Sequence, residues 1–290
     1  MKAAAFDYIR AASVDEACAA LAADPDARII AGGQTLVPMM AMRLARPSKI
    51  VDISRIPDLV GIEERGEELQ IGAATRQRAV ELSSTVAKRL PLLAEAIQHV
   101  GHLPTRHRGT VGGSIVNADP SAEIPLVATI LDATFHFIGP YGVEQMTPDE
   151  FFIGPMLTSL PEGACLTRVD FPIWDAPRLG IGFEEISARK SDYAYVAAGA
   201  QVALAEDGSI DRVALGLGGV EDRPVSLDLS ALEGAIWSAT AARDLVAAEI
   251  ADFDPLDDLH ASAAYRSRVA VTLGLRVLER AVIDAKGEPV

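Results

Sequence analysis

The chain has 290 residues, enough for two or three modest domains that each have a core. Its net charge of −15 argues against nucleic acid and anionic membranes as partners, and no apolar run reaches the roughly 20 residues that span a bilayer. Because the N-terminal residues lack the apolar core of a signal peptide, the expected location is the cytoplasm. The two cysteines, Cys18 and Cys165, are too few to hold an iron–sulfur cluster and are expected to be buried free thiols.

The N-terminal part predicts a short α/β unit. Ser13 is a suitable N-cap for a helix, with Glu16 at the capping-box position. The apolar runs at 27–31 and 49–53 predict two strands.

The first of these strands leads into a glycine pair, in the segment Ala31-Gly32-Gly33-Gln34-Thr35-Leu36. Glycines allow positive φ angles and a close approach of the backbone to a ligand. Thr35 is a candidate N-cap for a helix from Leu36 onward. A strand, a glycine turn and a helix N-terminus together predict a phosphate-binding loop, although a Gly-Gly turn alone is more often structural.

A second α/β unit follows. Its predicted elements are a strand at 69–74, a helix capped by Thr75, helices at 90–100 and 124–130, and a strand at 134–138. The basic segment 101–109 is expected to be irregular. It contains two of the three histidines His99, His102 and His107, but neighbouring arginines make a metal site there improbable.

A second glycine pair lies in this unit, surrounded by short hydrogen-bonding side chains. These residues are Thr110, Gly112, Gly113, Ser114 and Asn117. Two such turns are suited to hold the two ends of one elongated, anionic cofactor.

Further along, Ser121 is a candidate cap for the next helix. Glu123, in the first turn of that helix, either accepts hydrogen bonds from ribose hydroxyls or merely favours the helix N-terminus.

Past residue 173 the pattern predicts an α+β domain. Strands are expected at 180–187, 195–205 and 210–217, followed by helices at 231–250 and 260–285. Tyr193 is either a strand aromatic that packs on the core or a contact to a flat ring. No nucleophilic triad and no pair of catalytic carboxylates stands out, so the sequence predicts a cofactor cradle without its own catalytic machinery.

Residues 30–38 and 108–120, with the later Phe183-Glu184-Glu185-Ile186 and Asp192-Tyr193-Ala194, resemble the FAD-binding medium subunit of molybdenum hydroxylases. This is the family of xanthine dehydrogenase and aerobic carbon monoxide dehydrogenase. The resemblance implies an α+β fold with two FAD-binding subdomains of the vanillyl-alcohol-oxidase type, at 1–58 and 59–173. A C-terminal domain at 178–287 is expected to hold a three-stranded sheet and helices.

The resemblance also implies roles for individual residues. Ala31 to Leu36 are expected to wrap the FAD pyrophosphate, and Thr110, Gly112, Gly113, Ser114 and Asn117 to form the second phosphate and ribityl contact. Glu123, beside Ile124, falls where relatives have an aspartate that contacts the adenosine part. The residues expected near the flavin are Val100, Leu160, Glu185 and Tyr193. Some relatives have a lysine at or next to Glu185, so this chain lacks a positive charge there.

In that family the large subunit holds the molybdenum cofactor and a small subunit holds two [2Fe–2S] clusters. The resemblance therefore implies an electron-transfer subunit of a heterotrimer, assembled as a dimer of heterotrimers. The substrate of such a complex is an N-heteroaromatic, a purine-like ring, an aldehyde or carbon monoxide. The alternatives are a stand-alone flavin oxidase that acts directly on a small substrate, and a non-enzymatic nucleotide-binding module.

Overall fold

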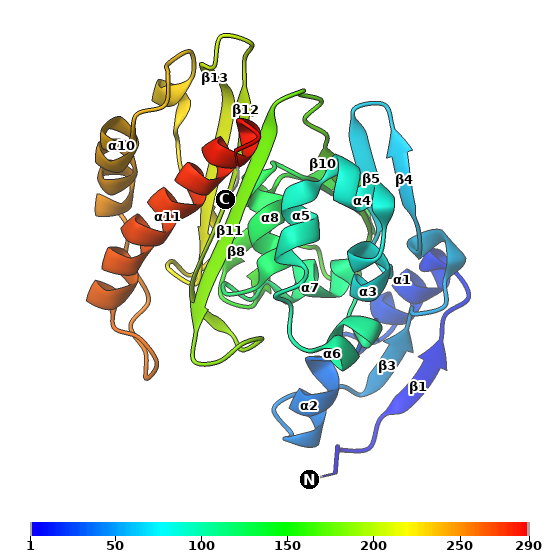
Figure 1. Ribbon diagram of the computed structural model, residues 1–290. Coiled ribbons are helices and arrows are strands. Elements are labelled where there is room, and N and C mark those ends of the chain that lie inside the picture. Colours follow the sequence, from blue (N-terminus) through cyan, green and yellow to red (C-terminus); the bar gives the residue numbers. More distant parts are fainter. Residues whose placement is uncertain (1, 289–290) are drawn as a thin grey trace.

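The computed structural model describes residues 2–288 and shows a mixed α/β protein with three main sheets (Figure 1). Each sheet is built from a separate stretch of the chain, in the order of the sequence. The bounds 1–58, 59–173 and 178–287 remain a prediction. No helix in the described part is long and apolar enough to cross a membrane, and the cytoplasmic location also remains a prediction.

The N-terminal lobe is a three-stranded parallel sheet in the order β1-β3-β2. Ser13 caps the first helix as predicted, because its hydroxyl accepts the N–H of Glu16 at 3.2 Å. The elements of this lobe are β1 (Asp7–Arg10), α1 (Val14–Ala22), β2 (Arg28–Ile30), α2 (Leu36–Ala41) and β3 (Lys49–Asp52).

The central part is a five-stranded antiparallel sheet in the order β4-β5-β10-β6-β7, covered by short helices. Its strands are β4 (Ile62–Arg65), β5 (Glu68–Gly72), β6 (Thr134–Gly139), β7 (Gly142–Met146) and β10 (Cys165–Pro172), with a small hairpin of β8 (Phe152–Gly154) and β9 (Leu157–Thr158). Its helices are η1 (Pro57–Leu59), α3 (Gln77–Glu81), α4 (Ser84–Arg89), α5 (Pro91–Ala96), α6 (Leu103–Arg108), α7 (Val111–Asn117), α8 (Glu123–Ile130) and α9 (Pro148–Phe151).

Two predicted helix caps in this part are wrong. Thr75 does not cap α3, because its hydroxyl both accepts from the N–H of Gly61 and donates to the carbonyl of that residue. Ser121 does not cap α8, whose N-cap is Ala122. At Thr75 another backbone partner competes for the short side chain.

Two predicted segments also differ in extent. The segment 101–109 is not irregular, because Pro104 fits the first turn of α6, where its missing N–H costs nothing. The helix predicted at 90–100 ends earlier, at Ala96.

The C-terminal part is a four-stranded antiparallel sheet in the order β11-β12-β13-β14. The expected three strands are its three long ones, and β14 adds two residues at the edge. The helix predicted from 231 begins only at Ala239. The elements are β11 (Leu179–Ser187), β12 (Ala194–Leu204), β13 (Ile210–Gly218), β14 (Val225–Ser226), η2 (Ser230–Leu232), α10 (Ala239–Ala251) and α11 (Ala263–Ala285).

Three apolar cores join these layers, and the smallest packs the N-terminal lobe against the central sheet. Another lies between the central sheet and β11–β13, where α5 and α8 fill the space (Figure 1). The third lies between the C-terminal sheet and α10 and α11. Because α8 is buried along nearly its whole length, its N-terminus is held rigidly beside the site described below.

Candidate cofactor-binding site

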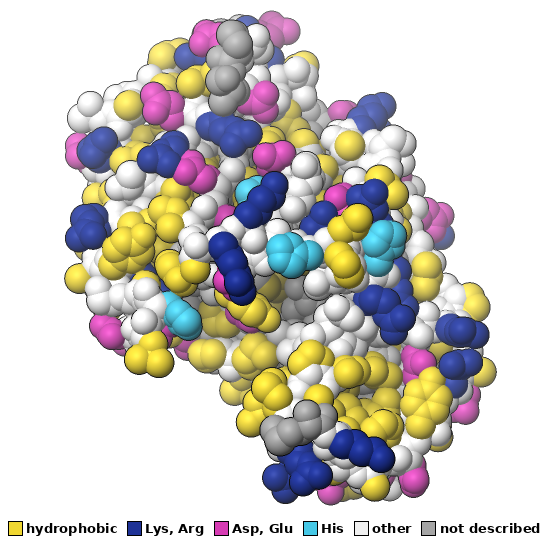
Figure 2. Space-filling view, turned by 60° about the horizontal axis from the view of Figure 1, so that its bottom comes forward, with side chains coloured by type: hydrophobic (Ala, Val, Ile, Leu, Met, Phe, Trp, Pro, Cys, Tyr) yellow, Lys and Arg dark blue, Asp and Glu magenta, His cyan; other side chains and the backbone are white. Residues whose placement is uncertain are grey.

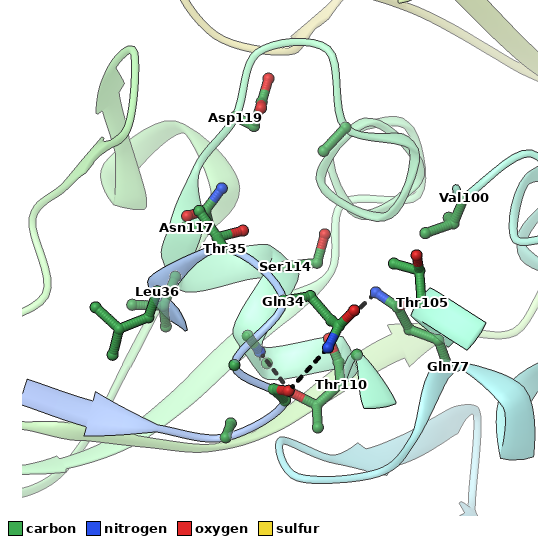
Figure 3. Close-up of a pocket in the computed structure, with 18 of the residues that line it drawn as sticks. Gln34, Thr35, Leu36, Gln77, Val100, Thr105, Thr110, Ser114, Asn117 and Asp119 are labelled. Atoms are coloured by element: carbon green, nitrogen blue, oxygen red, sulfur yellow. Dashed lines mark hydrogen bonds between the residues drawn. The ribbon is translucent and has the colours of Figure 1, made fainter. Parts of the chain in front are cut away.

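A cleft of about 550 Å³ lies between the N-terminal lobe, the central helices and the loop before β12. This volume falls within the roughly 300–1,000 Å³ typical of ligand sites. Figure 2 shows a molecular face that is hollowed between the N-terminal lobe and the rest, with arginine and histidine side chains nearby. Both glycine pairs line the cleft, and Figure 3 shows their labelled neighbours Gln34 and Ser114 close together.

The first glycine loop presents a row of backbone donors. The N–H groups from Gly32 to Leu36 have no hydrogen-bond partner within residues 2–288. Gly33 has φ +71°, a left-handed conformation that favours glycine. Thr35 is the N-cap of α2 by position, but its side chain makes no capping bond. The loop therefore offers free donors to phosphate oxygens, as the sequence predicts.

The second glycine pair differs from the prediction. Gly112 and Gly113 lie in the first turn of α7 and have no positive φ, so they do not form a turn. Their N–H groups are already used, by the carbonyl of Ala73 and the hydroxyl of Thr110. The N–H of Ser114 donates to the carbonyl of Thr110. This segment therefore offers the cleft side chains and a close-packed surface rather than a row of free N–H groups.

Close packing explains why glycine is needed in this helix. A Cβ on Gly112 would lie 2.5 Å from the Cβ of Ala73, and one on Gly113 would lie 2.7 Å from the hydroxyl oxygen of Thr110. On the other side, a Cβ on Gly32 would lie 2.5 Å from the carbonyl oxygen of Arg108. Gly32 thus packs against the backbone just before the second glycine segment, and Gly112 packs against Ala73, directly after the end of β5.

One end of the cleft combines apolar and acidic side chains. Val100, Leu160 and Tyr193 all line it, and Tyr193 is 67% exposed. Burial, followed by the charges of Asp119 and Glu123, raises the pKa of the Tyr193 phenol, which places these groups near one another. These side chains could therefore pack against a flat ring, with the carboxyl groups of Asp119 and Glu123 near it.

Glu123 is the first residue of α8 and lines the cleft. Burial, mainly, raises the pKa of its carboxyl from 4.5 to about 8, and the charges of Glu185 and Asp119 add to the effect. At neutral pH the carboxyl is therefore largely protonated, so it can donate as well as accept a hydrogen bond.

Two residues predicted at the site do not line the cleft. Ile124 is fully buried in the core. Glu185 lies behind the cleft, where its carboxylate is 3.4 Å from Nδ1 of His99. Because successive residues of a strand face opposite sides, Glu184 points the other way and pairs with Arg276.

In the structure, His99 serves as the partner of the Glu185 carboxylate. The interaction with the Glu185 carboxylate is the largest cause that raises the pKa of the His99 imidazole. A protonated His99 imidazole would place a positive charge beside Glu185, at the position where the sequence itself has no lysine.

The remaining predicted residues all line the cleft. They are Ala31, Gly32, Gly33, Gln34, Thr35, Leu36, Val100, Thr110, Gly112, Gly113, Ser114, Asn117, Glu123, Leu160 and Tyr193. The cleft also contains polar residues that the sequence did not single out, notably Arg28, Gln77 and Thr105. Arg28 and Thr105 lie in the elements directly before the two glycine segments, whereas Gln77 comes from α3 and meets them only in the fold.

The cleft combines a row of free backbone N–H groups with apolar side chains that can contact a flat ring. This combination is typical of a module that binds a nucleotide cofactor. The chain belongs to the family of FAD-binding subunits of molybdenum hydroxylases. Residues 4–174 match the FAD-binding domain of molybdopterin dehydrogenase, and residues 182–281 match the C-terminal domain of the carbon monoxide dehydrogenase flavoprotein. The fold class and the oxidoreductase assignment are thereby confirmed.

Similar proteins cover nearly the whole chain. The 6-hydroxypseudooxynicotine dehydrogenase complex subunit alpha of Paenarthrobacter nicotinovorans is 35% identical over 99% of this chain and 97% of the relative. The carbon monoxide dehydrogenase medium chain of Hydrogenophaga pseudoflava is 33% identical over 95% and 96%. The structure of quinoline 2-oxidoreductase from Pseudomonas putida 86 has a TM-score of 0.92 at 35% identity and covers 98% of this chain and 99% of that chain.

Proposed function

We propose that this chain is the electron-transfer medium subunit of a heterotrimeric molybdenum hydroxylase. FAD would lie in the cleft and receive electrons from [2Fe–2S] clusters of a small subunit, and a large subunit would hold the molybdenum cofactor. Bound FAD supplies reversible one- and two-electron transfer, and the protein supplies binding, orientation and electrostatics.

The first glycine loop carries this proposal. Its N–H groups from Gly32 to Leu36 lack partners in the described part of the chain, although backbone donors are rarely left unpaired. A pyrophosphate has acceptor oxygens and no donor, so it matches this row. Ser114 and Asn117 of α7, which lie beside Gln34 and Thr35 in Figure 3, would add side-chain hydrogen bonds.

We place the isoalloxazine beside Val100, Leu160 and Tyr193, three cleft-lining side chains that offer apolar contact. Glu123 lies near Tyr193, and its charge affects the pKa of the phenol. We therefore propose that Glu123 faces the flavin end of the cofactor rather than the adenosine part. The extra methylene relative to aspartate then extends the carboxyl toward the ring.

Large apolar side chains exposed near the cleft support the proposed partner subunits. Val37 and Leu44 are 51% and 71% exposed on the N-terminal lobe, and Met156 and Leu157 are 46% and 54% exposed on the β8–β9 hairpin. Exposed apolar groups of this size often mark contact sites for other proteins. A dimer of heterotrimers is the assembly that we propose.

The test is stepwise reconstitution of the full-length chain. We expect one FAD to bind per chain, and the bound flavin to be reduced only when both partner subunits and a substrate of the complex are present. The substrate panel should contain an N-heteroaromatic, a purine, an aldehyde and carbon monoxide. A chain that retains no flavin, with or without its partners, contradicts the proposal.

The same experiment separates the alternatives. A stand-alone oxidase would show rapid flavin reduction by a small substrate without any partner chain. A simple nucleotide-binding module would bind ADP as tightly as FAD, because the flavin ring would add no contacts.

A further inference from the structure

Gln77 lies at the point where the central helices meet the second glycine segment. It is the first residue of α3, lines the cleft, and is only 5% exposed. Its backbone N–H donates to the carbonyl of Gly109 at 3.0 Å. Its side-chain Nε2 donates to the carbonyl of Thr110 at 3.5 Å. The side chain therefore lies directly against the segment that leads into α7.

The carbonyl oxygen of this side chain accepts no hydrogen bond from the described residues. Oε1 of Gln77 is buried and has no hydrogen-bond partner in the described part of the chain. The amide cannot gain one by turning over, because Oε1 would then face the Thr110 carbonyl, which is also an acceptor. A buried acceptor without a partner destabilises the protein, so a ligand that brings a donor would be favoured here.

The position of Gln77 indicates which part of the cofactor brings that donor. Gly109 lies next to the Gln77 amide on one side and packs against Gly32 on the other, so Oε1 is close to the loop with the free N–H groups. Phosphate oxygens only accept and cannot satisfy Oε1. In a flavin dinucleotide, the groups joined directly to the pyrophosphate are the ribityl chain and the ribose, and both carry hydroxyls.

We propose that the side-chain carbonyl of Gln77 accepts a hydrogen bond from a sugar-chain hydroxyl of the bound cofactor. Gln77 thus positions the hydroxyl-bearing part of FAD next to the pyrophosphate, and its own orientation is fixed by Thr110. This inference rests on the proposed function, because it requires FAD in the cleft. Figure 3 shows Gln77 and Thr105 on the side of the cleft opposite to Leu36 and Asn117.

The test is the substitution Gln77→Met in the full-length apoprotein, which keeps the side-chain length and removes the acceptor. The matched control is Gln201→Met. Gln201 is also buried, at 2% exposure, with an unpartnered Oε1, but it lies in β12 and does not line the cleft. We expect Gln77→Met to weaken FAD binding about tenfold, as for the loss of one hydrogen bond, and Gln201→Met to leave it unchanged.

Competition of FMN and of ADP against FAD separates the two sources of the hydroxyl. If Gln77→Met loses affinity only for FMN, the donor is a ribityl hydroxyl. If it loses affinity only for ADP, the donor is a ribose hydroxyl. Either result supports the inference. Equal losses for both ligands would mean general damage to the cleft and would overturn it, as would unchanged FAD affinity in Gln77→Met. If the unsubstituted chain binds no FAD, the proposed function itself fails.

Discussion

Gly32 of the first glycine pair packs directly against Gly109, next to the second: a Cβ on Gly32 would lie 2.8 Å from the Cα of Gly109. The two residues belong to different α/β units, so this contact brings the two walls of the cleft together. Any side chain at position 32 would push the walls apart. The contact thus sets the width of the cleft at the site where the pyrophosphate is proposed to bind.

The first prediction concerns the left-handed conformation of Gly33. We expect Gly33→Ala to weaken FAD binding at least tenfold, because the positive φ costs a non-glycine residue about 1–2 kcal/mol and the loop would shift. The matched control is Gly66→Ala, which has φ +62° and no atom near its Cβ position. Both variants should lose thermal stability, but only Gly33→Ala should lose FAD, measured by flavin fluorescence. Equal FAD affinity in both variants would contradict the role of this loop.

The second prediction concerns the packing of Gly112. In Gly112→Ala the new methyl group would overlap Ala73, and overpacking of this kind typically costs about 1–3 kcal/mol. The control is Gly274→Ala in α11, where the nearest atoms are 3.4 Å away. There the better helix propensity of alanine should stabilise the protein by up to about 1 kcal/mol. Denaturant unfolding of the two variants should therefore give changes of opposite sign; two destabilised variants would argue against this packing.

The third prediction concerns pH and Glu123. Because its carboxyl has a pKa of about 8, it is largely protonated at pH 7 and gains a negative charge at higher pH, which would repel the anionic cofactor in the same cleft. FAD affinity should therefore fall as the pH rises through about 8. In Glu123→Gln the fall should be absent, as titration calorimetry between pH 6 and pH 9 would show. The control is Glu233→Gln, a substitution of an exposed residue, which should show the same decrease in FAD affinity as the unsubstituted chain.

The same group affects the stability of the apoprotein. The pKa of Glu123 is raised from 4.5 to about 8 in the folded state, so the folded chain holds a proton that the unfolded chain releases between these values. Stability must then decrease as the pH rises across this window. We expect Glu123→Gln to flatten this part of the pH–stability curve, and an unchanged slope would show that the carboxyl is not buried in this way.

The fourth prediction concerns Arg266, which joins the C-terminal sheet to α11. Its buried guanidinium donates to the carbonyls of Tyr195 and Gly219 and forms an ion pair with Asp258 at 2.7 Å. Arg266→Leu should lower the free energy of unfolding by at least about 1.5–3 kcal/mol, the value of one lost hydrogen bond to a charged group. The exposed Arg268→Leu on the same helix should have a small effect. FAD affinity at a temperature where the variant is folded should not change, because Arg266 does not line the cleft.

Local sequence signals predicted most of the long elements and the two glycine segments that line the cleft. The alternation of apolar residues located β11, β12 and β13, and the Ser13 cap located α1. Signals from single residues were less reliable. The hydroxyl of Thr75 does not cap a helix because it bonds to the backbone of Gly61 instead, and the hydroxyl of Thr35 makes no capping bond.

The sequence by itself determined the first glycine loop, which predicts a site for a cofactor. It did so because free loop donors and positive φ require glycine, and the Gly32-Gly33 pair follows a strand and precedes a helix. Only the tertiary structure decided how the second pair works: the N–H groups of Gly112 and Gly113 are used internally, and these residues serve close packing instead. The fold likewise decided the roles of Gln77, Glu123 and Glu185, because burial and partners depend on elements far away in the sequence.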